Sequence, residues 1–363
     1  MNHAIPICDL HCDTAMGLAA GKTLDDPELQ VNLPAMREAG IGLQVFACYV
    51  PPVLPEGRKF DFASKMLDAL EKEIGAHGAE ITVCRCTQDI LDARSSGRIA
   101  AILAVENGDA LEGDLKNLER FHARGVRLLT LVHSRSNRWI ISCGDKAPSF
   151  EGLTRFGEEI VAAMNKLGMI IDVSHAHDRA VEKVLEQSCR PIVASHSCAY
   201  TLCPVPRNLK DPLIKRIAAG GGLVGVNIYP GFLDAGYTKA SEKLGDLFSE
   251  ISKEEEKAGP DPAKHDAVFR GAAGERFRKA MSAYRVPLDR YLEHLFHMLT
   301  VAGDDHVAFG SDFDGVPDLP EGVTGCRGLG LVRTRLAEAE LPRKSIEKLC
   351  WTNFLRIFQA VCG

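Results

Sequence analysis

Eight short apolar runs rich in β-branched residues recur along this chain, and stretches with helical spacing separate most of them. Uninterrupted apolar strands that alternate with helices are typical of a parallel sheet covered on both faces. Eight such units predict an α/β fold, a single (β/α)8 barrel of the TIM type. The expected strands are residues 5–11, 41–50, 99–106, 126–133, 169–175, 191–196, 223–229 and 306–312, and the clearest expected helices are 62–76, 115–124, 156–167, 179–187 and 213–219.

Two segments interrupt this alternation. Residues 51–88 contain a long helical pattern and a small extra apolar run at 81–86. Residues 230–287 are polar and rich in charge, which predicts a helical insertion between strands 7 and 8, over one face of the barrel. A C-terminal helix is expected over 343–360. Because barrels of this type often exceed 250 residues as one domain, we expect one metallo-hydrolase barrel domain over 1–363.

Composition excludes several classes of partner. The chain has 43 Lys and Arg against 49 Asp and Glu, a formal net charge of −6, and no run of five basic residues, which disfavours nucleic acid. No apolar stretch reaches the roughly 18–20 residues needed to span a bilayer, so no membrane partner is expected. The first residues, which include Asp9, lack the basic segment of a secretory signal. Twelve cysteines without a CxxC pair then indicate reduced thiols and a cytoplasmic protein.

Polar side chains able to bind ligands end seven of the eight expected strands. In a parallel barrel these ends emerge at one mouth, where the active site of such enzymes is built. Packing alone does not explain this coincidence, although any one of these residues would be ordinary by itself. The residues are His11 with Asp13, then Glu106, His133, His175, His196, Tyr229 and Asp312.

A subset of these residues suits two metal ions. His11 and Asp13 lie two positions apart, so both point to the same face of a strand and can hold one cation. His175 and His196 end neighbouring strands and can hold a second, with Glu106 bridging both. Imidazole and carboxylate together suit Zn²⁺, and Mn²⁺, Co²⁺ or Fe²⁺ accept the same ligands. Two ions roughly 3.5–4 Å apart polarise a carbonyl and activate a bridging water.

Further residues have both a functional and an ordinary interpretation. Arg207, in a loop after His196, can clamp a carboxylate or can be a solvated arginine. Asp312 can carry a proton from the attacking water to the leaving amine. Glu106 alone would also fit a salt bridge inside the barrel. His294 and His297 lie three apart on a helix and are a weaker alternative metal pair, while Asp314 and Cys12 are expected in a turn and in packing.

Seven segments resemble the membrane dipeptidase (renal dipeptidase) family of the amidohydrolase superfamily. They run in the family's order from about residue 7 to 358. The segment with Arg207 and the GSDFDG segment are the most specific of them, whereas the first HxD is shared across the superfamily. The segments are DLHCDT (9–14), VENG (105–108), LTLVHS (129–134), IDVSH (171–175), ASHS (194–197) with PRN (206–208), GSDFDG (310–315) and NFLR (353–356).

The resemblance implies a zinc-dependent dipeptidase that hydrolyses L-Xaa-D-Xaa or L-Xaa-L-Xaa dipeptides with a hydroxide that bridges two Zn²⁺ ions. His11, Asp13 and Glu106 match the ligands of one zinc, and Glu106, His175 and His196 those of the other. His133 matches the residue that stabilises the oxyanion. Arg207 and Tyr229 match substrate-binding positions, Arg207 for the C-terminal carboxylate, and Asp312 matches the acid that handles protons and the substrate amine. The family's soluble microbial branch and a homodimer are expected.

Two alternatives stay open at this stage. The first is a metal-dependent esterase, lactonase, phosphotriesterase or acyl-amino-acid hydrolase on the same barrel. The esterase-type sites usually bridge their metals with a modified lysine at a strand end, but no lysine ends an expected strand and Glu106 takes that position. The second is a non-enzymatic barrel with a decayed site, which the complete set of expected ligands disfavours.

Overall fold

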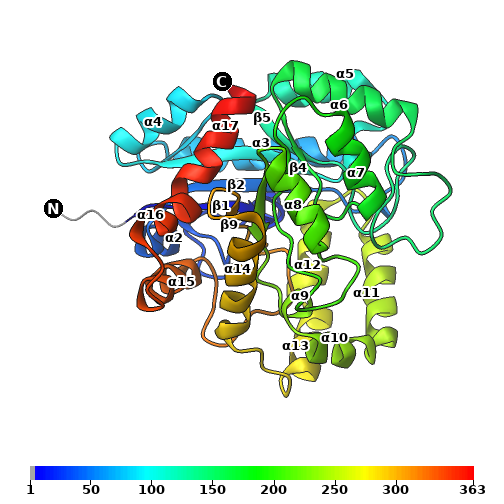
Figure 1. Cartoon of the computed structure of the whole chain (residues 1–363). Helices are drawn as coiled ribbons and strands as arrows, with labels where there is room; N and C mark the ends of the chain where they lie inside the picture. Colours follow the sequence, from blue (N-terminus) through cyan, green and yellow to red (C-terminus); the bar gives the residue numbers. More distant parts are fainter. Residues whose placement is uncertain (1–4) are drawn as a thin grey trace.

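A computed structural model describes residues 5–363, so the first four residues of the expected 1–363 domain lie outside it (Figure 1). Its centre is a closed barrel of eight parallel strands in the order β2-β1-β9-β8-β7-β6-β5-β4, closed by pairing of β2 with β4. β3 pairs with β4 beside β5. The strands are β1 Ile7–Cys12, β2 Ile41–Tyr49, β3 Ile81–Val83, β4 Ile99–Glu106, β5 Val126–Thr130, β6 Ile170–Asp172, β7 Val193–Ala194, β8 Leu223–Val226 and β9 Val307–Phe309.

Helices surround this barrel, and their bounds confirm the expected alternation. Those between β1 and β6 are α1 Thr14–Ala19, α2 Leu33–Ala39, α3 Lys59–Ala76, α4 Thr87–Ser95, the short 3₁₀ segment η1 Gly108–Leu111, α5 Leu115–Ala123 and α6 Arg155–Leu167. Those that follow β6 are α7 Asp178–Gln187, α8 Asp211–Ala219, α9 Pro230–Leu233, α10 Ala235–Glu242, α11 Gly245–Ala258, α12 Pro262–Arg270, α13 Ala272–Met281, α14 Leu288–Ala302, α15 Arg327–Glu338, α16 Arg343–Glu347, the π-helical η2 Lys348–Thr352 and α17 Asn353–Cys362.

Local sequence explains where these helices begin and end. The Thr154 side chain accepts a hydrogen bond from the backbone N–H of Gly157 and so caps the start of α6. Gly168 ends the same helix at φ 74°, a left-handed conformation that favours glycine. Only Gly168 and Met169 separate α6 from β6, so the connection from the helix to the barrel needs no long loop.

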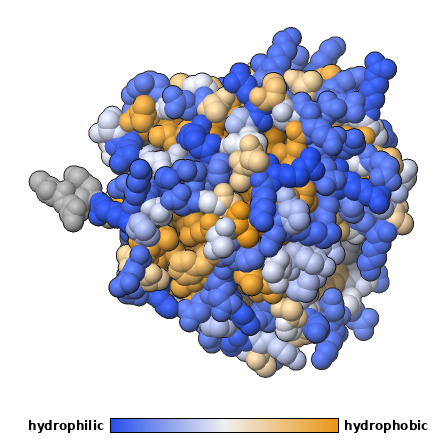
Figure 2. Space-filling view, in the orientation of Figure 1, coloured by the Kyte–Doolittle hydropathy of each residue, from blue (hydrophilic) through white to orange (hydrophobic). Residues whose placement is uncertain are grey.

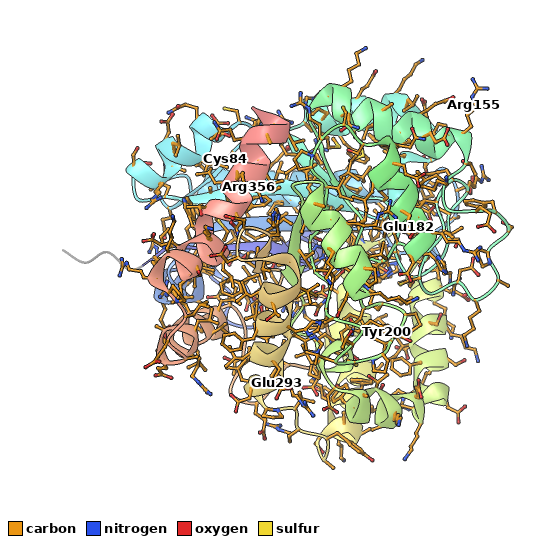
Figure 3. All side chains as sticks on the ribbon, viewed as in Figure 1. Cys84, Arg155, Glu182, Tyr200, Glu293 and Arg356 are labelled. Carbon is orange, nitrogen blue, oxygen red and sulfur yellow. The ribbon has the colours of Figure 1, made fainter. Side chains whose placement is uncertain are left out.

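Alternate residues of the strands pack into two different apolar layers. Leu43, Val45 and Ala47 of β2 belong to a cluster that also contains the aromatic residues of α17, whereas Phe46 and Cys48 pack in the larger cluster with the surrounding helices. This alternation follows from the two-residue period of a strand. Figure 3 shows side chains filling the space between helices and barrel, while Arg155, at the start of α6, points into solvent. The barrel therefore has packed interior and exterior faces, which hold the strand ends in place.

The eight expected strands are all present, but five of them are shorter than expected. β5, β6, β7, β8 and β9 stop two or three residues before the polar residue at which each was expected to end. Beyond β6, β7 and β9 the backbone leaves the sheet ladder, and the N–H groups of Ser174, Ser195 and Ser311 bond to the buried carboxylates of Asp172 and Asp9 instead. The run 81–86 forms β3, and the expected closing helix consists of α16, η2 and α17.

Residues 230–287 form the helices α9–α13, which lie between β8 and β9 and gather on one side of the barrel (Figure 1). Arg270 of α12 joins them to the β9 loop, because its guanidinium donates to Asp266 and, at 3.0 Å, to Asp314. Figure 2 shows a face that is mostly hydrophilic, with apolar residues gathered in patches between the hydrophilic ones. Within residues 5–363, no helix is both long and apolar enough to cross a membrane.

Candidate active site

The sequence-predicted residues meet at the carboxyl ends of the strands, around a cavity of about 690 Å³. His11 lies in β1 and Asp13 directly after it, while Glu106 is the last residue of β4. The others stand in loops just beyond the strands. Lining the cavity are Asp13, Glu106, His133, His175, Arg207, Tyr229 and Asp312, and His11 and His196 lie fully buried beneath them.

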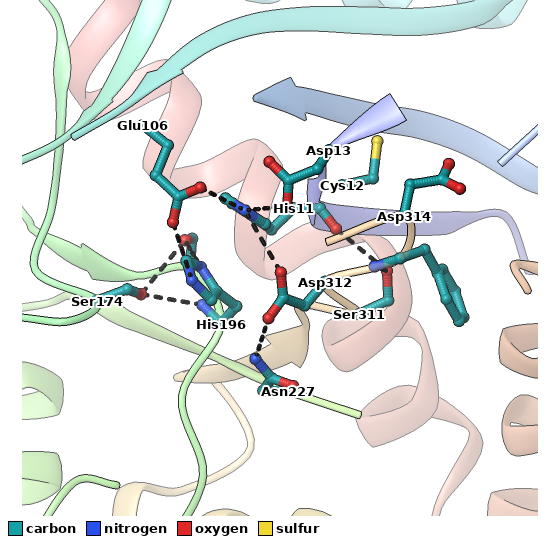
Figure 4. A network of polar contacts seen from close by, with 12 residues as sticks. His11, Cys12, Asp13, Glu106, Ser174, His196, Asn227, Ser311, Asp312 and Asp314 are labelled. Atoms are coloured by element: carbon teal, nitrogen blue, oxygen red, sulfur yellow. Dashed lines mark hydrogen bonds and ion pairs between the residues drawn. The ribbon is translucent and has the colours of Figure 1, made fainter. Parts of the chain in front are cut away.

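The two carboxylate oxygens of Glu106 face two different groups of ligands (Figure 4). Glu106 Oε2 lies 3.5 Å from His11 Nε2, which in turn is 3.5 Å from Asp13 Oδ2. Glu106 Oε1 lies 3.2 Å from His175 Nε2 and 3.4 Å from His196 Nε2. A carboxylate that presents one oxygen to each of two clusters has the arrangement of a bridging ligand.

Several buried polar atoms in these clusters have no hydrogen-bond partner among the described residues. They include both ring nitrogens of His11 and Oδ1 of Asp13. The Nε2 atoms of His175 and His196 approach to 2.9 Å. Buried polar groups are rarely left unpaired, and nitrogen and oxygen atoms that converge on one point suit a divalent cation. The residues therefore fit the metal centre that the sequence predicts.

The charges of the site favour neutral imidazole in one cluster. Burial lowers the pKa of His175 and His196, and the Arg207 guanidinium lowers both further. Burial alone would also lower the pKa of His11, but Glu106 and Asp13 raise it well above its ordinary value. Burial raises the pKa of Asp13 to about 8, with Glu106 adding repulsion. Since metal ligands must be deprotonated, a cation would displace protons from the His11 and Asp13 pair.

A buried relay fixes the orientation of His196. The Ser195 hydroxyl donates to Asp172 Oδ2 at 2.6 Å and accepts from His196 Nδ1 at 2.7 Å. Asp172 also accepts from the hydroxyl of Thr130 and from the backbone N–H groups of Ser174 and Ser195. With its proton held on Nδ1, His196 turns an unprotonated Nε2 toward Glu106. Such outer partners set the tautomer of a ligating histidine.

Replacing Ser195 with alanine is expected to weaken metal binding by about 10–100-fold, the usual effect of removing an outer partner. The variant leaves His196 Nδ1 without its acceptor and Asp172 without one donor. Competition of Zn²⁺ between the protein and a chelator measures the change. Ser188→Ala, at the end of α7 and away from the cavity, is the matched control. Equal affinity in both variants would contradict the relay.

Asp312 is held by a parallel set of contacts, which sequence reasoning missed. Asn227 Nδ2 donates to Asp312 Oδ2 at 2.7 Å, and Asp312 Oδ1 lies 3.7 Å from His11 Nε2. Asp9 accepts from the backbone N–H and the hydroxyl of Ser311, the residue before Asp312. Asp312 itself has φ 66°, as has His175. Strained backbone at non-glycine residues clusters in functional sites, where the surrounding bonds impose it.

The residues predicted to contact substrate lie around the same centre. Arg207 is 9% exposed and donates to the Ser197 hydroxyl and to the His196 carbonyl, and its Nε has no partner among the described residues. Burial lowers the pKa of His133 to about 4, with Glu106 opposing and Arg207 adding to the effect. His133 is therefore a neutral imidazole that can still donate one hydrogen bond. Tyr229 stands in the cavity wall with its ring 5.0 Å from that of Phe232.

The structure also places the remaining candidates. His294 accepts from the backbone N–H of Ala199 and bonds to the Leu233 carbonyl, while His297 contacts Asp211 at 2.9 Å, so these two side chains serve structural contacts. The Cys12 thiol is buried against the Val45 carbonyl. Asp314 accepts from Thr14, from Arg270 and from the backbone of Gln30. Gly315 passes so close to Asp13 that a Cβ would lie 1.9 Å from its Oδ2.

Several known sequences similar to this chain are named as dipeptidases. The family described as Membrane dipeptidase (Peptidase family M19) matches residues 1–362. An uncharacterized dipeptidase of Schizosaccharomyces pombe is 27% identical over 341 residues, which cover 90% of this chain and 71% of that protein. Dipeptidase 3 of Mus musculus is 25% identical over 336 residues, which cover 92% of this chain and 58% of that protein.

Solved structures similar to this chain include metallopeptidases of the same family. The crystal structure of dipeptidase AC, a metallopeptidase of family M19, has a TM-score of 0.81 and 26% identity, and covers 99% of this chain and 100% of its own. A metallopeptidase from Rhodobacter sphaeroides, crystallised with a phosphinate mimic of the dipeptide L-Ala-D-Ala, has a TM-score of 0.79 and 25% identity, with the same coverage. Both folds therefore extend over nearly the whole chain.

Proposed function

The chain belongs to the membrane dipeptidase family, peptidase family M19, and is a metallo-dipeptidase, and we propose that it cleaves its dipeptides at a centre of two zinc ions. His11, Asp13 and Glu106 would hold one ion, and Glu106, His175 and His196 the other. The single observation that carries this proposal is the division of the two Glu106 oxygens between two ligand clusters. Zn²⁺ suits imidazole with carboxylate, and Mn²⁺, Co²⁺ and Fe²⁺ are possible substitutes.

When bound, such ions polarise a peptide carbonyl and lower the pKa of water toward neutrality. The protein's own groups would do the rest. Arg207 would bind the C-terminal carboxylate of the dipeptide, because it is a buried cation in the cavity wall with no carboxylate paired to it among the described residues. Tyr229 lines the wall beside it and would contact the same residue of the substrate.

His133 and Asp312 would act on the reacting bond. A neutral His133, 3.9 Å from Glu106 Oε1, would donate a hydrogen bond to the oxyanion that forms when water adds to the carbonyl. Asp312 would take the proton of the attacking water and pass it to the nitrogen of the leaving amine as the C–N bond breaks. Its contact with Asn227 holds one carboxylate oxygen and leaves the other directed toward His11.

Metal removal tests this function directly. Release of alanine from L-Ala-L-Ala and L-Ala-D-Ala is measured before chelation, after chelation and after Zn²⁺ is added back. We expect activity to fall below about 1% on chelation and to return with two Zn²⁺ per chain, since both clusters are required. Full activity with one ion per chain would contradict the two-ion centre. The ratio of the two rates gives the preference for a D- or L-residue.

Replacing Arg207 with alanine is expected to raise KM for free dipeptides by about 10–100-fold, because the variant loses the binding free energy of a charge-assisted hydrogen bond. C-terminally amidated dipeptides lack the carboxylate, so their KM should change little. Steady-state kinetics on both substrate types measure the difference. Arg216→Ala, an exposed change on α8, is the control. A similar rise in KM for both substrate types would argue against a carboxylate clamp.

A further inference from the structure

The cavity extends well beyond the metal-ligand clusters. Its volume of about 690 Å³ lies within the range of pockets that enclose drug-sized ligands, and a dipeptide of two alanines is much smaller than such ligands. The additional wall comes from the helices between β8 and β9, which no motif in the sequence explains. The cavity therefore has room for a large side chain beyond the dipeptide backbone.

One face of α11 forms much of this additional wall. Phe248, Ile251, Ser252 and Glu255 all line the cavity, and their spacing of three, one and three residues places them on one side of a helix. Phe248 is 41% exposed, although it is a large apolar side chain, and its ring lies 5.5 Å from that of Phe277 on α13. Covering an apolar surface of this kind with an apolar ligand removes it from water, which lowers the free energy and favours binding.

The apolar wall continues to the arginine that would hold the substrate carboxylate. Phe232 of α9 lines the cavity, and the guanidinium carbon of Arg207 lies 5.4 Å from the centre of its ring. Val205 and Pro206, which directly precede Arg207 in the chain, also line the cavity. The side chain of a C-terminal residue branches from the carbon next to its carboxylate. Once that carboxylate contacts Arg207, the side chain is at the start of the apolar wall.

From this placement we propose that α9, α11 and α13 form an apolar specificity subsite, which selects dipeptides with a large apolar side chain on the C-terminal residue. Phe232, Phe248 and Ile251 are its specificity-determining residues, and the buried Phe277 of α13 packs behind Phe248. The assignment of the C-terminal side rests on the proposed role of Arg207. The apolar wall itself depends only on the residues that line the cavity.

The test compares kcat/KM for Ala-Ala, Ala-Leu and Ala-Phe, each with an L- and a D-residue at the C-terminus, with the reversed dipeptides Leu-Ala and Phe-Ala. We expect Ala-Leu and Ala-Phe to exceed Ala-Ala by about 10-fold or more, as burial of a large apolar side chain implies. The reversed dipeptides should show no such advantage. The absence of a preference, or a preference that follows the N-terminal residue, would overturn the proposal.

The double variant Phe248→Ala with Ile251→Ala tests whether the α11 face causes the preference for large C-terminal side chains. It should reduce the advantage of Ala-Leu and Ala-Phe to less than about 3-fold, because the contact area is lost. Its kcat/KM for Ala-Ala should stay within about 2-fold of the original, since both side chains lie outside the metal-ligand clusters. This unchanged rate also reports that the variant is folded. Survival of the full preference in the double variant would overturn the proposal.

Glu256→Ala provides the matched control, because Glu256 is exposed on the same helix and does not line the cavity. It should leave every ratio unchanged. Failure of this subsite is distinguishable from failure of the two-zinc mechanism. If the subsite is wrong, Ala-Ala is still cleaved in a zinc-dependent reaction but without an advantage for large side chains. If the mechanism is wrong, cleavage of Ala-Ala does not depend on two ions.

Discussion

Replacing Glu106 with glutamine is expected to lower kcat/KM for alanyl-alanine by at least about 10⁴-fold, or roughly 5.5 kcal/mol of transition-state stabilisation. Glutamine has nearly the same shape, but it cannot offer a negatively charged oxygen to both clusters. His11 and His175 lie 3.5 Å and 3.2 Å from different oxygens of this one carboxylate. Loss of the bridge should therefore remove metal from both clusters.

The fold should survive this change. Glu106 is the last residue of β4, and the barrel strands below it are held by apolar packing and by the sheet ladder. Elemental analysis of bound zinc, kinetics and circular dichroism of the metal-free protein together test the prediction. His196→Ala should also lose bound metal, although Glu106 and its bridging carboxylate are unchanged in that variant. Glu119→Gln, exposed on α5, should change nothing. Full activity of the Glu106 variant would refute the bridging role.

Periodicity predicted the barrel well because its signal is repeated eight times. Each apolar run must be buried on both faces, and each helix must cover the sheet, so an error at one element does not alter the topology. The strand ends were less predictable. β7 contains only Val193 and Ala194, because the Ser195 N–H bonds to Asp172 rather than continuing the ladder. Such a side-chain acceptor leaves no periodic pattern in the sequence.

The candidate site was predictable to the extent that its residues end strands. His11, Glu106, His175 and His196 could be proposed because a parallel barrel brings all strand ends to one mouth. Asn227 and Ser195 were missed, since an amide or a hydroxyl near a strand end is common in loops. A carboxylate within a buried strand was an available signal: Asp9 and Asp172 are both fully buried among apolar residues. Each accepts a hydrogen bond from the residue that precedes a site residue, just beyond the end of a neighbouring strand: Asp172 from Ser195 before His196, and Asp9 from Ser311 before Asp312.

The proposed apolar subsite was not predictable from the sequence at all. Residues 230–287 carry no repeated pattern beyond helical spacing, and their relation to the cavity depends on how five short helices pack. Contacts such as that of Arg270 with Asp314 join this insertion to the β9 loop, which carries Asp312. The proposed specificity therefore depends on tertiary packing, whereas the proposed metal ligands depend on the barrel topology.

Asp312→Asn is expected to lower kcat by about 10²–10⁴-fold, the usual contribution of one general acid–base group. Asparagine keeps the size of the side chain and can still contact Asn227, but it cannot accept the proton of the attacking water. kcat should fall far more than KM for alanyl-alanine rises, because Arg207 would still hold the carboxylate when Asp312 no longer contacts the substrate amine. Asp305→Asn, an exposed change in the loop before β9, is the control.

The metal content of the Asp312→Asn variant shows whether Asp312 is a proton carrier or a metal ligand. His11, His196 and Asp312 offer ligand atoms within 4.8 Å of one another, so Asp312 has the geometry of a third ligand as well as that of a proton carrier. A proton carrier leaves zinc binding intact when it is replaced, whereas a ligand does not. We expect Asp312→Asn to retain two Zn²⁺ per chain. Its lowered kcat should not recover when Zn²⁺ is added in excess. Loss of an ion, with recovery of activity at high Zn²⁺, would instead make Asp312 a ligand. The proton transfer would then fall to another group at the cavity, such as His133, whose Nε2 lies 3.9 Å from Glu106 Oε1.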